Sequence, residues 1–195
     1  GSGFFQVNQS RGLRWNTARG FLRTAMRRGN LRVVTHAMVK RITLDGRCAT
    51  GVEWLADNAP FRASARSEIV LAAGAINTPK LLELSGIGQA DRVASLGIPV
   101  VYDLPGVGEN LQDHLTINIQ QGLHGLVTFY EETRPLQMVK NLYKYLFQGR
   151  GLLAHPASQA GVFFRSSPER TRPDAQVHFA PAASEDDGKG NLKTS

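Results

Sequence analysis

The residues whose types and spacing could do chemistry begin with Gly74 and Ala75, at the carboxyl end of a short, mainly apolar stretch at residues 68–74. Such a stretch ending in glycine is typical of a strand buried on both faces of a parallel or mixed sheet. In open α/β sheets ligands bind beyond the carboxyl ends of such strands, and glycine lets a ligand approach the backbone closely. The pattern indicates either a cofactor edge or a glycine that only permits close packing of a helix, and the residues alone favour neither.

The single cysteine, Cys48, offers little further chemistry. It excludes an internal disulfide framework and a cysteine-based metal site, so the simplest redox context is a reducing one. We expect a buried, neutral thiol at this position and no metal site in the chain.

A helix is predicted near the start of the chain, at residues 17–28. Apolar residues recur there at i, i+3, i+4, i+7 and i+8 from Ala18, which predicts one buried face with arginines on the other. Asn16 or Thr17 fits the N-cap of this helix. Gly29 fits a left-handed residue that terminates it.

A β-hairpin is predicted next, because residues 31–44 and 49–55 are rich in β-branched and apolar side chains. Asp45 and Gly46 between them are the residues that a tight reversing turn needs. The hairpin would precede the strand predicted at residues 68–74.

Two further helices and an alternating strand complete the predicted elements. One helix starts after the predicted strand, with Thr78 as its cap, Pro79 in its first turn and Gly86 at its end. An amphipathic helix is expected at residues 135–148. The alternation of apolar residues at 115–119 predicts a strand before it.

The basic balance of the chain, with a net charge of +7 and a pI near 10.0, suggests nucleic-acid binding. However, much of the densest basic stretch falls on the solvent face of the helix predicted at residues 17–28. No zinc-finger spacing, RNP-type aromatic strand or helix-turn-helix pattern accompanies it, so we expect no nucleic-acid partner. The absence of any apolar run of about eighteen residues and of a signal segment predicts no membrane span. We expect a cytoplasmic location, with peripheral attachment to the inner membrane as the alternative.

The string GAINTPKLLELSGIG at residues 74–88 resembles the second signature of the glucose-methanol-choline (GMC) oxidoreductases, with Asn77 within the family's variation. The similarity continues, in order, over segments at residues 28–39, 104–114, 161–166 and 173–179. The chain is therefore similar to a choline-dehydrogenase-like bacterial member, and we interpret it as an interior fragment of such an enzyme.

The resemblance implies an α/β (α+β) fold class, with part of an FAD-binding Rossmann-like domain followed by part of an α+β substrate-binding domain. Residues 12–114 would form the central part of the FAD-binding domain. Residues 115–195 would form the first part of the substrate-binding domain, and residues 1–11 would join the substrate-domain side.

The function implied by the resemblance is that of an FAD-dependent alcohol dehydrogenase or oxidase. A hydride would pass from the CH–OH group of a small alcohol to the flavin, and electrons would then pass to oxygen or another acceptor. The backbone of Val39 would contact the adenine, Ala73 and Gly74 would lie along the cofactor, and Asn110 would approach the flavin. A non-catalytic member and a lyase of the same family stay open as alternatives.

The substrate implied by the resemblance depends on Gln159. Choline-type relatives commonly carry an acidic residue at this place, and a cationic substrate needs an acidic or aromatic partner. Glutamine there favours a neutral alcohol, and choline dehydrogenase proper is the alternative.

Two features of the family are not found in the 195 residues. No G-x-G-x-x-G fingerprint occurs, and no histidine matches the family's catalytic position. We therefore expect no catalytic residue in this chain and a structural or exposed role for its five histidines: His36, His114, His124, His155 and His178. The chain by itself should neither hold FAD tightly nor oxidise an alcohol, and should self-associate through exposed apolar sheet surface.

Overall fold

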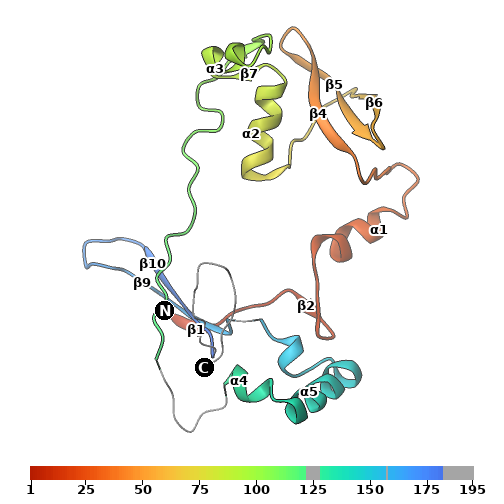
Figure 1. Cartoon of the computed structure of the whole chain (residues 1–195). Helices are drawn as coiled ribbons and strands as arrows, with labels where there is room; N and C mark the ends of the chain where they lie inside the picture. Colours follow the sequence, from red (N-terminus) through yellow and green to blue (C-terminus); the bar gives the residue numbers. More distant parts are fainter. Residues whose placement is uncertain (122–127, 157, 182–195) are drawn as a thin grey trace. The chain divides into compact units, whose positions relative to one another are not determined.

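The computed structural model describes residues 1–121, 128–156 and 158–181 (Figure 1). They form two compact units. Residues 32–116 are here called the central unit. The described residues before 32 and after 116 are called the terminal unit.

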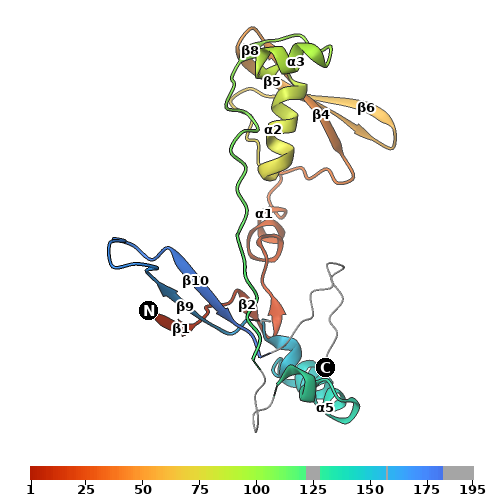
Figure 2. The same ribbon diagram turned by 60° about the vertical axis from the view of Figure 1, so that its left-hand side comes forward.

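The central unit contains an antiparallel sheet and a helix that packs on its edge strand (Figure 2). The sheet runs in the order β4 (Met38–Asp45), β5 (Cys48–Ala56) and β6 (Ala59–Ser64). The helix is α2 (Gly74–Leu84), and it contacts β4. Ile42 of β4 and Leu81 of α2 are both buried, so the apolar core of this unit lies where the helix meets the strand.

The second half of the central unit is built on the end of α2. It comprises β7 (Ile87–Gly88), α3 (Ala90–Ser95) and β8 (Tyr102–Asp103), and β7 pairs in parallel with β8. Val93 of α3 is fully buried. The guanidinium of Arg47, in the β4–β5 turn, lies 4.2 Å from the ring centroid of Tyr102, which joins the hairpin to β8.

The terminal unit contains a three-stranded antiparallel sheet in the order β1-β9-β10. Its strands are β1 (Ser2–Phe4), β9 (Ala160–Phe164) and β10 (Ala175–Phe179). β9 and β10 overlap the segments of family similarity at residues 161–166 and 173–179. The unit also holds a small pair, β2 (Gln9–Ser10) with β3 (Leu13–Arg14).

The helical elements described in the terminal unit are short, with one exception. They are η1 (Ala18–Leu22), a π-helical turn that continues into α1 (Arg23–Ala25), then α4 (Phe129–Glu132), α5 (Pro135–Gln148) and η2 (Leu152–Ala154). The amphipathic helix expected at residues 135–148 is confirmed with the same bounds. Proline occupies its first position, and Gly149 ends it with a φ of +62°.

The predicted turns of the central unit are confirmed where the signal is local. Asp45 ends β4 and Gly46 takes a φ of +56°, as the hairpin turn requires. A second turn, which the sequence reasoning missed, places Asp57 and Asn58 at φ values of +50° and +61° between β5 and β6. Gly86 ends α2 with a φ of +84°, as expected.

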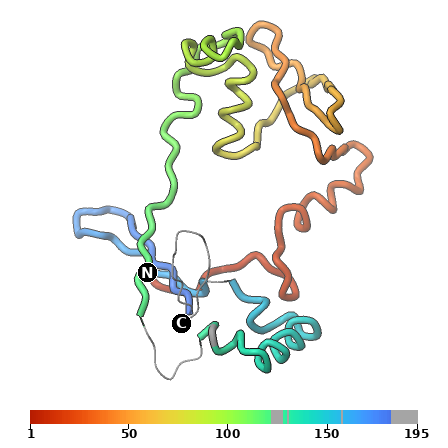
Figure 3. The backbone as a smooth tube through the Cα atoms, viewed as in Figure 1, coloured from red at the N-terminus to blue at the C-terminus, as the bar shows by residue number. Residues whose placement is uncertain are grey.

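The strand predicted at residues 68–74 is wrong. Residues 65–73 form neither helix nor strand (Figure 3), and the side chain of Val70 is 77% exposed. A strand of a parallel sheet exists only with neighbours to pair with, and no described residue provides one for this segment. The alternating segment at residues 115–119 is also not a strand, and its apolar side chains are exposed for the same reason.

The start of one helix differs from expectation, and the start of another agrees with it. α2 begins at Gly74, before Thr78, whose hydroxyl accepts the N–H of Ala73 at 3.1 Å from inside the helix. The cap expected at Asn16 or Thr17 is confirmed at Asn16, whose side chain accepts the N–H of Arg19 at 3.0 Å.

The first helix then ends earlier than predicted, at Ala25, and Gly29 does not take a positive φ. Its apolar face, which we expected to be buried, is open, with Phe21 75% exposed. Two predictions for the hairpin are also wrong. The first strand is predicted from residue 31, but β4 begins at Met38 because the positive φ of His36 interrupts the extended chain. The thiol of Cys48 is predicted to be buried, but it is exposed.

Candidate cofactor-binding site

Gly74 opens α2 with a φ of +88°, a conformation that side chains other than glycine adopt at a cost. A Cβ atom built at this position would meet no atom within 4 Å in the described part of the chain. The first N–H groups of a helix have no acceptors within that helix. The backbone at the start of α2 is therefore open to approach from outside.

Ala73 lies directly before this opening. Its side chain is exposed, and its N–H donates to the hydroxyl of Thr78. That bond closes the turn from residue 73 into α2, so Thr78 holds the backbone at Gly74 in its position.

Val39 lies near the start of β4, opposite Trp54 of β5, and is 41% exposed. A bulge between Val39 and Arg41 leaves Lys40 as the extra residue of the strand. Bulges increase local twist and redirect a strand. Val39 is therefore the last regularly paired residue before the interruption of the β4–β5 ladder at Lys40.

Asn110 is exposed and takes a φ of +57°, which asparagine tolerates better than most residues. It follows a loop that lies beside α2, since a Cβ on Gly108 would stand 3.7 Å from Cβ of Pro79. The central unit thus brings together the elements that carry Val39 and Gly74, and sets the segment before Asn110 against the same helix.

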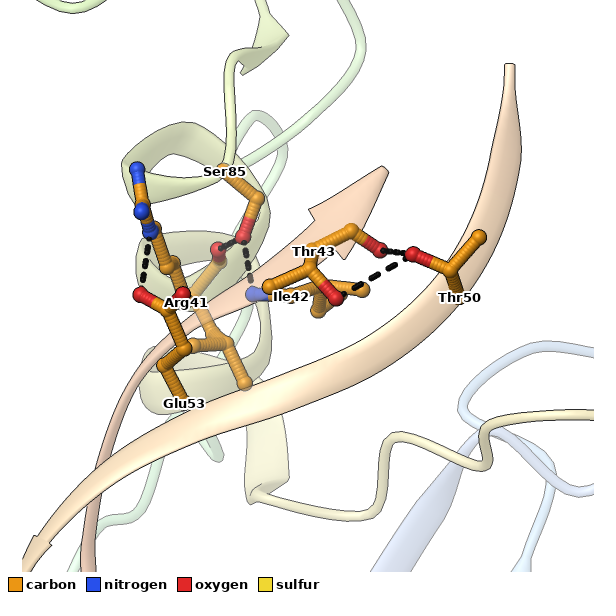
Figure 4. Close-up of polar contacts among 7 residues, drawn as sticks. Arg41, Ile42, Thr43, Thr50, Glu53 and Ser85 are labelled. Carbon is orange, nitrogen blue, oxygen red and sulfur yellow. Dashed lines mark hydrogen bonds and ion pairs between the residues drawn. The ribbon is translucent and has the colours of Figure 1, made fainter. Parts of the chain in front are cut away.

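Ser85 fastens α2 to β4 and is the contact that the sequence reasoning missed (Figure 4). Its hydroxyl accepts the N–H of Ile42 at 2.8 Å and donates to the carbonyl of Leu81 at 2.6 Å. A serine followed by glycine at a helix end is a local signal for termination, but nothing local identifies a partner 43 residues away.

Charged side chains of the central unit form ion pairs, not a catalytic cluster. Arg41 and Glu53 pair across β4 and β5 at 2.7 Å (Figure 4). The hydrogen bond from Arg41 lowers the pKa of the Glu53 carboxyl from its ordinary value. Glu83 of α2 pairs with Arg92 of α3 at 2.7 Å. Both pairs are partly exposed, so they contribute little stability.

Four of the five histidines lie among the described residues, and His124 lies outside them. His36 and His114 are exposed in the central unit, and His178 of β10 contacts the ring of Phe5 with centroids 5.1 Å apart. Within the same residues no three metal-ligating side chains come together, and no helix has the length and apolarity needed to cross a membrane.

The similarity to a solved structure supports the α/β (α+β) fold class. An FAD-dependent oxidoreductase from Chaetomium thermophilum matches with a TM-score of 0.63 and 30% sequence identity, over 75% of this chain and 26% of that chain. The family follows from the sequence: the model described as GMC oxidoreductase matches residues 1–116. The chain belongs to the GMC oxidoreductase family, which confirms the resemblance.

Two relatives extend the similarity over nearly the whole chain. The mitochondrial choline dehydrogenase of Homo sapiens is 42% identical over 191 residues, which are 97% of this chain and 32% of that protein. An oxygen-dependent choline dehydrogenase of Escherichia coli is 44% identical over 184 residues, 93% of this chain and 33% of that protein. The chain spans about a third of the length of these relatives.

Proposed function

We propose that the full-length protein is an FAD-dependent enzyme acting on CH–OH donors, with a small alcohol as hydride donor and oxygen or another acceptor receiving the electrons. The family match over residues 1–116 carries the proposal. The similarity to an FAD-dependent oxidoreductase and to two choline dehydrogenases supports it. FAD, when bound, supplies the hydride-accepting centre, and the residues of this chain bind and orient it.

The start of α2 fits such a cofactor. The open backbone at Gly74 gives room for close approach, and the free amide groups of the first helical turn favour electron-rich atoms. In this proposal Ala73 and Gly74 lie along the cofactor. A packing role for Gly74 finds less support, since no described atom would meet a Cβ there.

Val39 and Asn110 complete the proposed contacts. The bulge directly after Val39 interrupts the ladder at Lys40, and this irregular backbone next to a half-exposed residue suits a main-chain contact to adenine. Asn110 follows the loop beside α2 and carries an amide that can donate and accept hydrogen bonds, which suits the polar edge of a flavin. No proton-transferring residue is assigned in this chain.

The proposed domains take the bounds that the resemblance implies, which differ from the two compact units in assigning residues 12–31 to the FAD-binding domain. Residues 12–114 belong to the FAD-binding domain, residues 115–195 to the substrate-binding domain, and residues 1–11 to the substrate-domain side. The pairing of Phe4 in β1 with Ala160 in β9 supports the last assignment. A cytoplasmic location remains part of this proposal.

The proposed substrate is a neutral alcohol, because residue 159 is an uncharged glutamine. Its backbone is held at the start of β9, with the carbonyl accepting the N–H of Phe5 at 2.9 Å and the N–H donating to Phe179 at 3.3 Å. An uncharged side chain at this fixed position offers a cation no ion pair. Choline is the second candidate, because two relatives at 42% and 44% identity carry that name.

Cofactor binding is tested with two glycines that share backbone strain but not position. Gly97 has a φ of +72° and, like Gly74, nothing within 4 Å of a built Cβ in the described part of the chain. We expect Gly74→Leu to abolish FAD retention on gel filtration of the full-length protein, and Gly97→Leu to keep it. Equal flavin content in the two variants would contradict the proposed contact.

The reaction is tested by comparing the turnover of choline with that of a primary aliphatic alcohol, using oxygen or a dye as acceptor. We expect the higher kcat/KM for the aliphatic alcohol. A strong preference for choline would make the protein a choline dehydrogenase. Bound FAD that no alcohol reduces would favour the non-catalytic or lyase alternatives.

A further inference from the structure

Ser85 is a buried polar side chain at the junction of the two elements proposed to hold the cofactor, and only 7% of it is exposed. It stands at the end of α2, where its hydroxyl donates to Leu81 one helical turn earlier. The same oxygen accepts the N–H of Ile42. A single hydroxyl therefore acts as donor to the helix and acceptor from the strand (Figure 4).

The N–H of Ile42 in β4 needs the Ser85 hydroxyl as its acceptor. β4 is an edge strand with β5 on one side, and the N–H of Ile42 points to the other side, toward α2. Ile42 as a whole is 6% exposed, so this amide lies in a buried junction. A buried N–H without an acceptor is costly, and Ser85 supplies the acceptor that a further strand would otherwise provide.

The bridge joins the two elements that carry the proposed cofactor contacts. Val39 is three residues before Ile42, about 10 Å along the strand. Gly74 is at the opposite end of α2, about 16 Å from Ser85 along the helix axis. A shift of the helix end against the strand would therefore displace both backbones relative to each other.

We propose that Ser85 is a positioning residue for FAD, which fixes α2 on β4 so that the backbones at Val39 and Gly74 meet one cofactor in a single alignment. This rests on the proposed function. Alanine removes both hydrogen bonds of the bridge, threonine keeps the hydroxyl, and cysteine keeps the shape with a weaker bond. Ser95 is a matched control, because its hydroxyl donates at 2.7 Å to Arg92 of its own helix and is exposed.

The experiment follows FAD release and unfolding of the full-length holoenzyme in the same urea titration. Flavin fluorescence reports release, and far-UV circular dichroism reports the fold. We expect Ser85→Ala to release FAD at urea concentrations at which the fold is intact, with affinity for FAD weakened about tenfold. Ser85→Thr and Ser95→Ala should behave as the wild type, and Ser85→Cys should be intermediate.

Several results would overturn the inference. If Ser85→Ala released FAD only as it unfolded, the role of Ser85 would be structural alone. If Ser85→Ala did not fold, wild-type FAD affinity in Ser85→Cys would refute the positioning role, whereas intermediate affinity would support it. If Ser85→Thr kept its fold at the same urea concentrations as the wild type but lost FAD as readily as Ser85→Ala, the hydroxyl would be excluded as the cause. A wild-type protein that binds no FAD would instead refute the proposed function.

Discussion

Replacing Gly86 by alanine should destabilise the central unit more than the same change at any open glycine of similar φ. Gly86 takes a φ of +84°, and a Cβ there would stand 2.8 Å from Cγ2 of Val101 and against the carbonyl oxygen of Pro99. Its own carbonyl accepts the N–H groups of Val101 at 2.8 Å and Tyr102 at 3.1 Å. The chain at residues 99–102 is therefore held against this residue and cannot retreat without breaking hydrogen bonds.

The magnitude has two parts. The left-handed backbone conformation costs about 1–2 kcal/mol for a residue with a Cβ. Forcing a methyl group into a packed site adds about 1–3 kcal/mol. Gly97→Ala, with a φ of +72° and open space around a Cβ in the described part of the chain, should show only the first part. The difference between the two variants is therefore expected to be about 1–3 kcal/mol in the free energy of unfolding.

Urea unfolding of the full-length protein measures this difference. Both variants should lower the midpoint at unchanged slope, with the larger shift for Gly86→Ala. Tryptophan fluorescence is a suitable probe, because Trp54 stacks on Phe61 within the same unit, with ring centroids 5.8 Å apart. Equal midpoints for Gly86→Ala and Gly97→Ala would refute the steric reasoning.

Three further predictions concern the terminal unit and the chain as a whole. Asn141→Ala should lower the free energy of unfolding by about 1.5–3 kcal/mol in urea titration, because this amide is buried and donates at 2.7 Å to the carboxylate of Glu132; an unchanged midpoint would contradict it. The hydroxyl and the N–H of Ser166 donate hydrogen bonds to the Asp174 carboxylate, and these bonds lower the pKa of Asp174. The ionised carboxylate therefore stabilises the β9–β10 connection fully above the ordinary pKa of 3.8. This stabilisation is lost as the pH falls through the lower folded-state pKa. The amide NMR shift of Ser166 should follow that loss in acid, and Asp174→Asn should remove the pH dependence. The 195-residue chain alone should sediment as an oligomer and retain no FAD on gel filtration; a yellow monomer would refute both expectations.

The features that the sequence predicted well are those decided within a few residues. α5 has the expected bounds because Pro135 fits a first helical turn and Gly149 accepts a left-handed φ. The β4–β5 turn is decided in the same way by Asp45 and Gly46. Local backbone preference is enough in these cases, since no distant partner is involved.

The features that the sequence predicted badly depend on distant partners. Periodicity around Val70 reports what a segment could bury, but not whether a neighbouring strand is there to pair with it. α2 begins four residues before Thr78, the residue predicted to cap it. Thr78 does accept a backbone hydrogen bond, from the N–H of Ala73, but it lies inside the helix. The link between Ser85 and Ile42 joins residues far apart in sequence and has no local signature.

The glycines of the signature string differ in what their missing side chains permit. At Gly86 a Cβ would collide with the chain, and at Gly88 it would stand 3.1 Å from Cγ of Glu83 and 3.2 Å from Cγ2 of Val93, so both glycines allow close packing. Gly74, at the other end of α2, has no such neighbour among the described residues. The end of α2 at Ser85 is thus fixed by the Ser85 hydrogen bonds and by close packing at Gly86 and Gly88, whereas the backbone at the other end, Gly74, is open. This asymmetry is what a helix needs if a fixed end is to hold a free end against a ligand, and it explains why one motif combines both kinds of glycine.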